Sequence, residues 1–403
     1  MAKRNRVIYQ SEALFVTKQY SGNATIDIVD GTHMNNHGNN TADNSSLQSG
    51  HFHQIHRVQS ANYNFAIARQ DINQFGNLAR IDTAVIDAPT VGLDFSYLIT
   101  DGTNEDKLGF TTDNEGQETS SVSGILSNIS GRNYHILTVK EGNDANEPSQ
   151  AGDATSSVIS IGNGYVTNYS MNAAVGSVPT ASVSVEGLNI TADQASTGLA
   201  TPSINPATST KGSTKFSLPD AVTGTVGDIL RPGDMTVSFG NNPGSAADGT
   251  GVLVNLTDSN DKAAAHIQSF SLDVPLGRSV LNRLGNAFGY SREIDFPITV
   301  SCSISAIVAD LKNGNLFDEL YDVKKHNIAI EMRKPSSTGG GSGSTQLRFN
   351  LKNVSLDSES YSSSIGDNKT VDLTFSATVG GPEDTTNGLF ISGEQITATE
   401  KGF

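Results

Sequence analysis

One stretch of the chain occurs twice, and this internal repeat limits the fold more than any other feature of the sequence. Residues 59–77 (QSANYNFAIARQDINQFGN) align with residues 268–286 (QSFSLDVPLGRSVLNRLGN) at a shift of 268 − 59 = 209, with six identities in nineteen positions. Apolar residues face one another at Tyr63/Leu272, Phe65/Val274, Ile67/Leu276, Ile72/Leu281 and Phe75/Leu284. Further on, IDAP (86–89) faces IDFP (294–297) at a shift of 294 − 86 = 208. We therefore predict two copies of one β-rich module.

The length of the chain agrees with a duplication. A chain of 403 residues is too long for one ordinary core and suits two domains of roughly 150–200 residues each. Residues 191–217 are rich in Ser, Thr, Ala and Pro and show no periodicity, which is typical of a connector. We predict a first domain at 1–190, a linker at 191–217 and a second domain at 218–403.

The pattern along each copy favours strands over helices. Gly, Ser, Thr, Asn and Asp are abundant and only 17% of residues are charged, as in chains of many short strands joined by turns. Residues 56–69 alternate and predict a long strand, and residues 70–80 predict either a hairpin tip or a turn or two of helix. The candidate inward residues of the long strand are Val58, Tyr63, Phe65 and Ile67. Both copies then run through a Pro-marked strand, a short strand, a loop and a closing hairpin. The predicted fold class is mainly β.

Charge and cysteine content exclude several classes of protein. The formal net charge is 26 − 42 = −16. A protein that grips DNA through its phosphates carries a basic face, which this chain lacks, whereas an acidic wall lets DNA slide past. The lone Cys302 cannot form an intrachain disulfide, and its surroundings (ITVSCSISAIVA) predict a buried strand residue. We expect neither a signal peptide nor contact with a membrane, because no apolar run of suitable length is present.

A histidine cluster is the best candidate for a metal site. His51, His53 and His56 occur within HFHQIH, near His33 and His37. Two histidines on one face of a strand could bind Zn²⁺ or Fe²⁺. No cysteine or patterned carboxylate accompanies them, so we favour a solvated strand entrance or a subunit contact, with a pH response as a further alternative.

Catalytic motifs are absent from the sequence. Neighbouring carboxylates such as Glu293 and Asp295 could form a glycosidase pair, but the separation that glycoside chemistry requires cannot be read from sequence. The glycine-rich segments 162–166 and 339–343 lack the lysine and helix of a phosphate loop, and neither G-x-S-x-G nor HExxH occurs. We expect a protein that is not an enzyme and needs no cofactor.

The two predicted tips carry polar residues suited to contacts between subunits. Arginines flank both tips, and structural ion pairs are favoured over ligand binding for them. The predicted subunit-contact residues are Arg69, Asn73, Gly76, Arg80, Arg278, Asn282, Gly285 and Arg292.

Several segments together resemble the tail tube (major tail) proteins of tailed bacteriophages, which are virion structural proteins. The segments are VIYQSEALFV (7–16), RVQSANYNFAIARQDINQFGNLARID (57–82), APTVGLDFSY (88–97), and HIQSFSLDVPLGR with YSREIDFPITV (266–278 and 290–300). The resemblance spans most of the chain but contains no short diagnostic motif. It implies two tandem tube-like β-sandwich/barrel domains, each with long hairpins and a short helix.

The resemblance also implies an assembly. In that family, hairpins complete an inner barrel shared round a ring, and loops bridge to the next ring. Most members carry one such domain in a hexamer, so a duplicated chain suggests trimeric rings with pseudo-sixfold symmetry, a hexamer remaining possible. The implied partners are the chain itself and other tail proteins (tape measure, terminator, distal tail or baseplate). DNA would pass through without specific binding, and the protein would be assembled in the host cytoplasm into the virion tail.

Two other classes remain open at this point. A different tail, neck or baseplate protein would form a single ring without polymerising. A host-surface adhesin would use its Asn/Ser-rich loops and histidines to bind glycans, and an enzyme ranks last.

Overall fold

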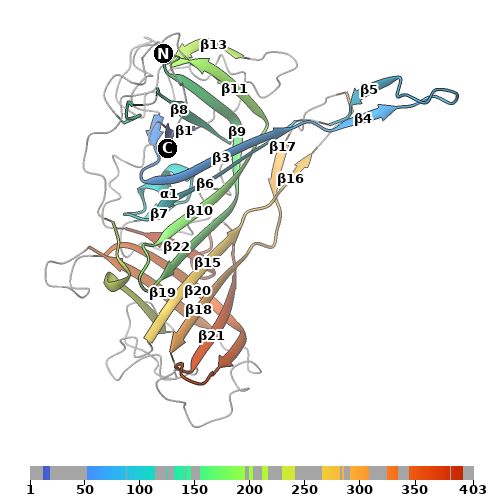
Figure 1. Ribbon diagram of the computed structural model, residues 1–403. Coiled ribbons are helices and arrows are strands. Elements are labelled where there is room, and N and C mark those ends of the chain that lie inside the picture. Colours follow the sequence, from blue (N-terminus) through green and yellow to red (C-terminus); the bar gives the residue numbers. More distant parts are fainter. Residues whose placement is uncertain are drawn as a thin grey trace.

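A computed structural model gives the fold of the chain, which is mainly β, as predicted (Figure 1). The structure describes residues 12–18, 52–87, 89–113, 125, 131–140, 142–146, 155–195, 199–202, 211–216, 229–240, 266–281, 284–285, 291–307, 325–334, 345–381 and 383–393. Within these residues no helix is long and apolar enough to span a bilayer.

The elements follow one another in two similar series. The first series is β1 (Glu12–Lys18), β2 (Phe52–Gln54), β3 (Val58–Ala66), β4 (Arg69–Ile72), β5 (Asp82–Val85), β6 (Thr90–Leu98), α1 (Thr103–Leu108), β7 (Thr112–Asp113), β8 (Arg132–Thr138), β9 (Ser157–Ala174), β10 (Thr180–Gly187) and β11 (Asn189–Gln194). After β12 (Leu199–Pro202), β13 (Lys211–Phe216) and a 3-10 turn (Pro232–Asp234), the second series is β14 (Met235–Gly240), β15 (His266–Pro275), β16 (Arg278–Leu281), β17 (Ser291–Ile294), β18 (Thr299–Ile307), β19 (His326–Arg333), β20 (Thr345–Ser362), β21 (Thr370–Thr378) and β22 (Gly388–Ser392).

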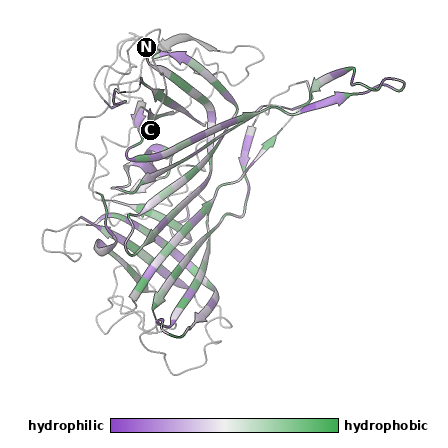
Figure 2. Ribbon diagram, viewed as in Figure 1, coloured by the Kyte–Doolittle hydropathy of each residue, from purple (hydrophilic) through white to green (hydrophobic). Residues whose placement is uncertain are grey.

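Eight strands form a continuous antiparallel layer, which we call the central layer. Its hydrogen-bonded order is β20-β21-β18-β15-β9-β10-β6-β3. Alternate residues along these strands are apolar and buried, which Figure 2 shows as green alternating with paler colours. The long strands β9 and β20 extend beyond the layer, where β9 pairs with β8 and β11 and β20 pairs with β19 and β22. Side chains from both regions contribute to one hydrophobic core.

The two series share strand register and burial. β6 and β18 are related by a shift of 299 − 90 = 209, and their nine positions show the same alternation of exposed and buried residues. β10 and β21 are related by 370 − 180 = 190, and all eight positions of β10 match. The pairings β3–β6 and β15–β18 even carry an irregularity at the same place, where Gln59 and Gln268 are the extra residues. The central layer therefore consists of two equivalent four-strand units, β3-β6-β10-β9 and β15-β18-β21-β20.

A strand pair joins the two units edge to edge. β9, at the end of the first unit, pairs with β15, at the start of the second, from Ala174↔Ser269 to Asn168↔Pro275. The two repeats thus share one sheet. We call this β9–β15 pairing the internal joint.

Helix α1 is fixed to the first unit by a buried polar network. The hydroxyls of Tyr97 and Tyr169 both donate to Glu105 Oε1, at 2.7 and 3.0 Å. All three side chains are buried, and burial raises the pKa of Glu105. The equivalent interval of the second repeat, where a second short helix was predicted, lies outside the described residues.

The structure refines several details of the sequence analysis. Part of the predicted linker is regular, since β12 and β13 form a two-stranded sheet and β11 pairs with β9. Residues 70–80 belong to the hairpin of β4 and β5, which spans residues 69–85, and they contain no helix. The match of IDAP to IDFP is displaced by one residue, because the strands on both sides keep a shift of 209 and Pro89 therefore corresponds to Ile298. The predicted burial of Cys302 is confirmed, with 0% of the residue exposed.

Candidate assembly surfaces

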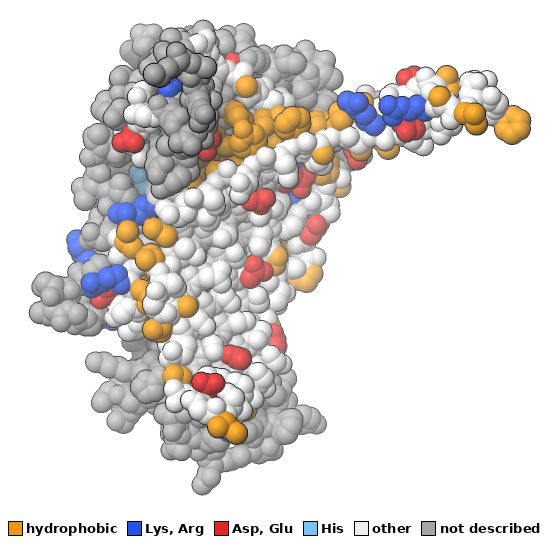
Figure 3. Space-filling model, in the orientation of Figure 1, with side chains coloured by type: hydrophobic (Ala, Val, Ile, Leu, Met, Phe, Trp, Pro, Cys, Tyr) orange, Lys and Arg blue, Asp and Glu red, His pale blue; other side chains and the backbone are white. Residues whose placement is uncertain are grey.

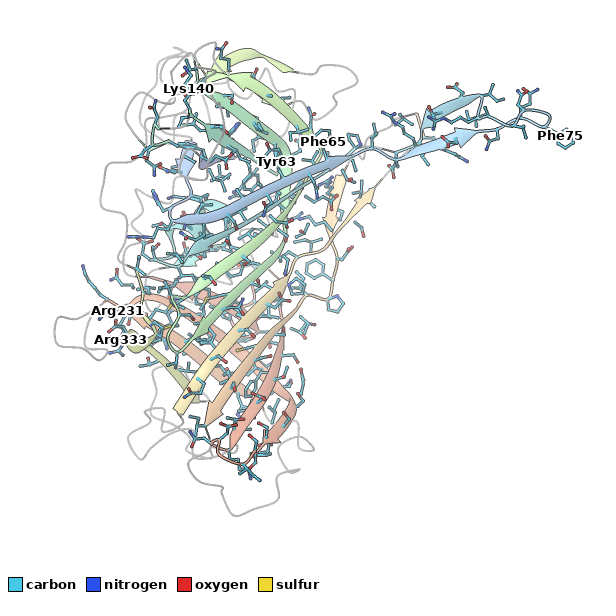
Figure 4. The ribbon with its side chains drawn as sticks, viewed as in Figure 1. Tyr63, Phe65, Phe75, Lys140, Arg231 and Arg333 are labelled. Atoms are coloured by element: carbon cyan, nitrogen blue, oxygen red, sulfur yellow. The ribbon has the colours of Figure 1, made fainter. Side chains whose placement is uncertain are left out.

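The outer edge of β3 is one end of the central layer. β3 pairs with β6, and in the described part of the chain no strand pairs with its other side. Tyr63, Phe65 and Ile67 lie on the core side of this edge or just beyond it, yet they are 40%, 69% and 42% exposed. Figure 4 shows Tyr63 and Phe65 along β3, and Figure 3 shows apolar side chains gathered along this side of the molecule. The predicted inward direction of Tyr63 and Phe65 agrees with the strand pairing, but these side chains are not buried in the isolated chain.

The second half of β20 is the other end of the layer. Residues 355–362 pair with β21, whereas the pairing with β19 ends at Val354. Among the described residues no strand lies on the outer side of 355–362. Tyr361 is only partly buried, and Ile365 in the following turn is fully exposed. An unpaired strand edge is a template for pairing with another chain.

The outward face of the central layer is polar, and the eight strands contribute no Lys or Arg to it; Arg292 of hairpin β16–β17 pairs with Glu186 at one place on this face. Its residues alternate with the buried ones, and they include four acids, Asp94, Glu186, Asp273 and Asp372, but no Lys or Arg. Most other positions are Ser, Thr or Asn: Ser60, Asn62, Asn64, Thr90, Ser96, Asn168, Ser170, Asn172, Thr180, Ser182, Ser184, Ser269, Ser271, Thr299, Ser301, Ser303, Ser305, Ser355, Ser358, Ser360, Ser362, Thr370, Thr374, Ser376 and Thr378. Figure 3 shows the outward face as a pale surface with scattered acidic groups.

Hydrogen bonds between strands hold many of these polar side chains to one another. The Ser184 hydroxyl donates to Asp94 Oδ1 at 2.7 Å, and Asn168 Nδ2 donates to Asp273 Oδ1 at 3.1 Å. Such bonds satisfy donors and acceptors within the face itself. This face was not predicted from the sequence, although the alternation of serine with apolar residues in TVSCSISAI (299–307) indicates a strand with one polar side.

The hairpin β4–β5 projects away from the body (Figure 1). The predicted contact residues Arg69, Asn73, Gly76 and Arg80 lie together on it and are exposed. Gly76 has φ of 95°, a left-handed conformation that favours glycine, and Arg80 forms an exposed ion pair with Asp71 (3.0 Å). Sequence reasoning missed the apolar side chains beside them as surface features: Phe75 and Leu78 at the tip are fully exposed (Figure 4).

The second hairpin, β16–β17, differs because the body partly covers its base. Arg278 lies with its guanidinium 4.4 Å from the ring centre of Tyr165 and donates to the Ile125 carbonyl at 3.0 Å. Arg292 pairs with Glu186 (3.3 Å). Burial lowers the pKa of both arginines. These two predicted contact residues therefore bind the first repeat of their own chain. Gly285 lies at the exposed tip, and Asn282 lies outside the described residues.

The described histidines do not form a metal site. His53 and His56 flank the end of β2, while His33, His37 and His51 lie outside the described residues. Burial lowers the pKa of His56 to about 4, and its backbone N–H donates to Asn104 Oδ1 (3.0 Å). Within the described segments no group of three His, Cys, Asp or Glu side chains could hold a metal ion.

No protein-family model matches the chain, and no curated protein matches it. Among solved structures the chain is similar to the anti-feeding prophage (AFP) baseplate, 6-fold symmetrised, with 13% identity, 43% of this chain and 99% of that chain covered, and a TM-score of 0.28. It is similar to the tail of an empty GTA particle (12% identity, 38% and 95% covered, TM-score 0.22) and to the Hcp protein (10% identity, 38% and 96% covered, TM-score 0.20). At these TM-scores, function has to be inferred from the chain's own surfaces.

Proposed function

We propose that this protein is the structural subunit of a phage tail tube, which polymerises as stacked rings into a hollow conduit for DNA. The observation that carries the proposal is the internal joint. The chain joins two equivalent units edge to edge, and in its described part no strand pairs with the corresponding two edges, on β3 and on residues 355–362 of β20. A second chain can repeat the joint at either end.

Repetition of the joint leads to a closed ring. The joint is heterologous, since it uses different strands on its two sides, and a heterologous contact closes into a ring when its rotation permits. Three chains with two repeats each would give six equivalent units. We accordingly assign residues 1–190 and 218–403 to the two tube domains and residues 191–217 to the connection between them.

The outward polar face suits the wall of a DNA conduit. A face whose strands supply carboxylates and hydroxyls but no Lys or Arg, and where Arg292 is already paired with Glu186, neutralises little phosphate charge, so DNA that moves along it gains little favourable ionic contact. We infer that this face lines the bore. The projecting hairpin β4–β5, with its exposed apolar tip, would contact the adjacent subunits or rings.

Electron microscopy of the purified chain tests this function. A tube subunit should form long hollow filaments, with the central layer around the lumen. A tail, neck or baseplate component would stop at a single ring, and a glycan-binding adhesin would remain a discrete oligomer. Either of the last two outcomes contradicts the proposal.

A further inference from the structure

We propose that β20 of one chain pairs with β3 of the next in the register of the internal joint, so that Tyr361 lies opposite Tyr63 of the neighbouring chain. The inference rests on the proposed function for its partner, a second copy of this chain. It adds to that function the register of the contact, that is, which residues of the two chains pair.

The equivalence of the two repeats determines the register. In the internal joint, the residue numbers of two paired residues always have the same sum, for example 171 + 272 = 443 for Met171↔Leu272. β9 maps to β20 by adding 190, and β15 maps to β3 by subtracting 209. If the same pairing joins two chains, the residue numbers of a pair must therefore sum to 443 + 190 − 209 = 424. This rule places residue 361 opposite residue 63 and residue 362 opposite residue 62.

Side-chain exposure shows what the edge of β3 lacks. At the internal joint, Leu272, Val274 and Leu276 are each 0% exposed. Their equivalents on β3 and just beyond it, at 272 − 209 = 63, 274 − 209 = 65 and 276 − 209 = 67, are Tyr63, Phe65 and Ile67, which are 40%, 69% and 42% exposed. Both sets are apolar and both lie on the core side of a strand. They differ in that β15 has β9 beside it, whereas β3 has no strand there among the described residues.

The edge of β20 shows the same difference. Met171 and Tyr169 of β9 are 0% exposed at the internal joint. Their equivalents at 171 + 190 = 361 and 169 + 190 = 359 are Tyr361 and Glu359, both only partly buried. The Tyr361 hydroxyl donates to the Glu359 carboxylate, so these two side chains present an apolar ring and a satisfied carboxylate to an incoming strand.

Backbone hydrogen bonds of the joint also carry over. The Val175 N–H donates to the Gln268 carbonyl, and the Leu276 N–H donates to the Thr167 carbonyl, both at 2.8 Å. In the joint between chains, the equivalent bonds are donated by the Ile365 N–H to the Gln59 carbonyl of the neighbouring chain, and by the Ile67 N–H of that neighbour to the Asp357 carbonyl. Hydrogen-bonded and non-hydrogen-bonded pairs alternate in an antiparallel ladder. Asn62 and Ser362 therefore form a non-hydrogen-bonded pair, whose Cα atoms lie about 4.5 Å apart.

Disulfide trapping between two variants, each with one introduced cysteine, tests this register. Asn62→Cys and Ser362→Cys both replace exposed polar side chains on the outward face, and the native Cys302 is 0% exposed. When differently tagged chains are mixed, assembled and oxidised, this pair should form a heterodimer in high yield. Disulfides need Cα atoms within about 7 Å. The control pair, Asn62→Cys with Ser358→Cys, uses the same face four residues out of register and should give little product.

The outcomes separate this inference from the proposed function. Filaments in which 62 and 362 cross-link, and 62 and 358 do not, support the register. Filaments in which the control pair cross-links instead, or in which neither pair does, overturn the register but leave the tube subunit intact. Folded variant chains that neither assemble nor cross-link overturn both the register and the proposed function.

Discussion

Asn163 and Asn353 occupy the same place in the two repeats, at a shift of 353 − 163 = 190, and both have a left-handed backbone, with φ of 56° and 58°. The N–H of Asn163 donates to Asn133 Oδ1 at 3.1 Å, and the N–H of Asn353 donates to Asn327 Oδ1 at 3.0 Å. Left-handed non-glycine residues are uncommon. Their recurrence with the same side-chain partner is a backbone signature of duplication that lies outside the aligned stretches 59–77 and 268–286.

The left-handed conformation at position 163 should lower the stability of variants that carry a residue less tolerant of positive φ than asparagine. We expect Asn163→Ala to lower the free energy of unfolding by about 1–2 kcal/mol, because alanine tolerates this conformation poorly. Asn163→Gly should lose less, since glycine adopts positive φ readily. Urea denaturation of both variants measures the difference. An alanine variant that is more stable than the glycine variant would contradict the backbone assignment.

The sequence predicts the strands of this protein better than it predicts which strands and side chains lie next to one another. Alternation of serine with apolar residues fixes which side of β18 is buried, and the repeat relates β18 to β6. No such pattern distinguishes Tyr63 from Leu272, because both are apolar residues between polar neighbours at the same position of the repeat. Their exposure depends on whether a strand lies beside them, and that strand comes from a distant part of the chain. The burial of Arg292 against Glu186, 106 residues away, was unpredictable for the same reason.

The buried network around Glu105 predicts an unusual response to pH. Burial raises the pKa of Glu105 in the folded protein, opposed by the hydroxyls of Tyr97 and Tyr169. The folded state therefore holds this proton to a higher pH than the unfolded state does. Stability from this group is fully present below the unfolded pKa, about 4.3, and is lost as the pH rises through the folded value.

Comparison with Glu105→Gln isolates this effect. The amide oxygen can still accept from a tyrosine, but it does not ionise. We expect the free energy of unfolding of wild type, relative to Glu105→Gln, to fall as the pH rises. Glu105→Leu should cost about 1–3 kcal/mol for each hydroxyl left unsatisfied. Urea titrations at several pH values give the difference, and a wild-type advantage that grows with pH would show that the pKa is lowered instead.

A cation on the outward face should make the tube retain DNA. Asp372 lies exposed on β21, so Asp372→Lys should leave folding unchanged and place one lysine per chain on the proposed lumen wall. We expect about tenfold more duplex DNA retained by assembled tubes at low salt, and no increase at high salt, because ionic contacts with phosphate weaken as salt rises. Co-sedimentation measures retention. Asp144→Lys makes the same charge change on an exposed loop after β8, and equal retention by this control would argue against the lumen assignment.

The tip of hairpin β4–β5 should matter for assembly and not for the stability of the chain. Phe75 and Leu78 are 105% and 111% exposed, so changing both to serine removes no contact within the chain. We expect the free energy of unfolding to stay within about 0.5 kcal/mol of wild type. Filament length, measured by electron microscopy, should fall sharply. Filaments of normal length would show that the tip makes no contact that tube growth requires.

The pair Tyr63 and Leu272 offers the most direct separation of folding from assembly. The two residues are equivalent, but Leu272 is 0% exposed at the internal joint and Tyr63 is 40% exposed at the open edge. Leu272→Ala should destabilise the chain by about 2–5 kcal/mol, as deletions in a packed core do. Tyr63→Ala should change the stability of the isolated chain by less than about 1 kcal/mol and should raise the concentration needed for assembly. Thermal unfolding of dilute protein and sedimentation of concentrated protein measure the two quantities separately. If Tyr63→Ala assembled at the wild-type concentration, the β3 edge would not be buried between chains, even if the protein forms filaments.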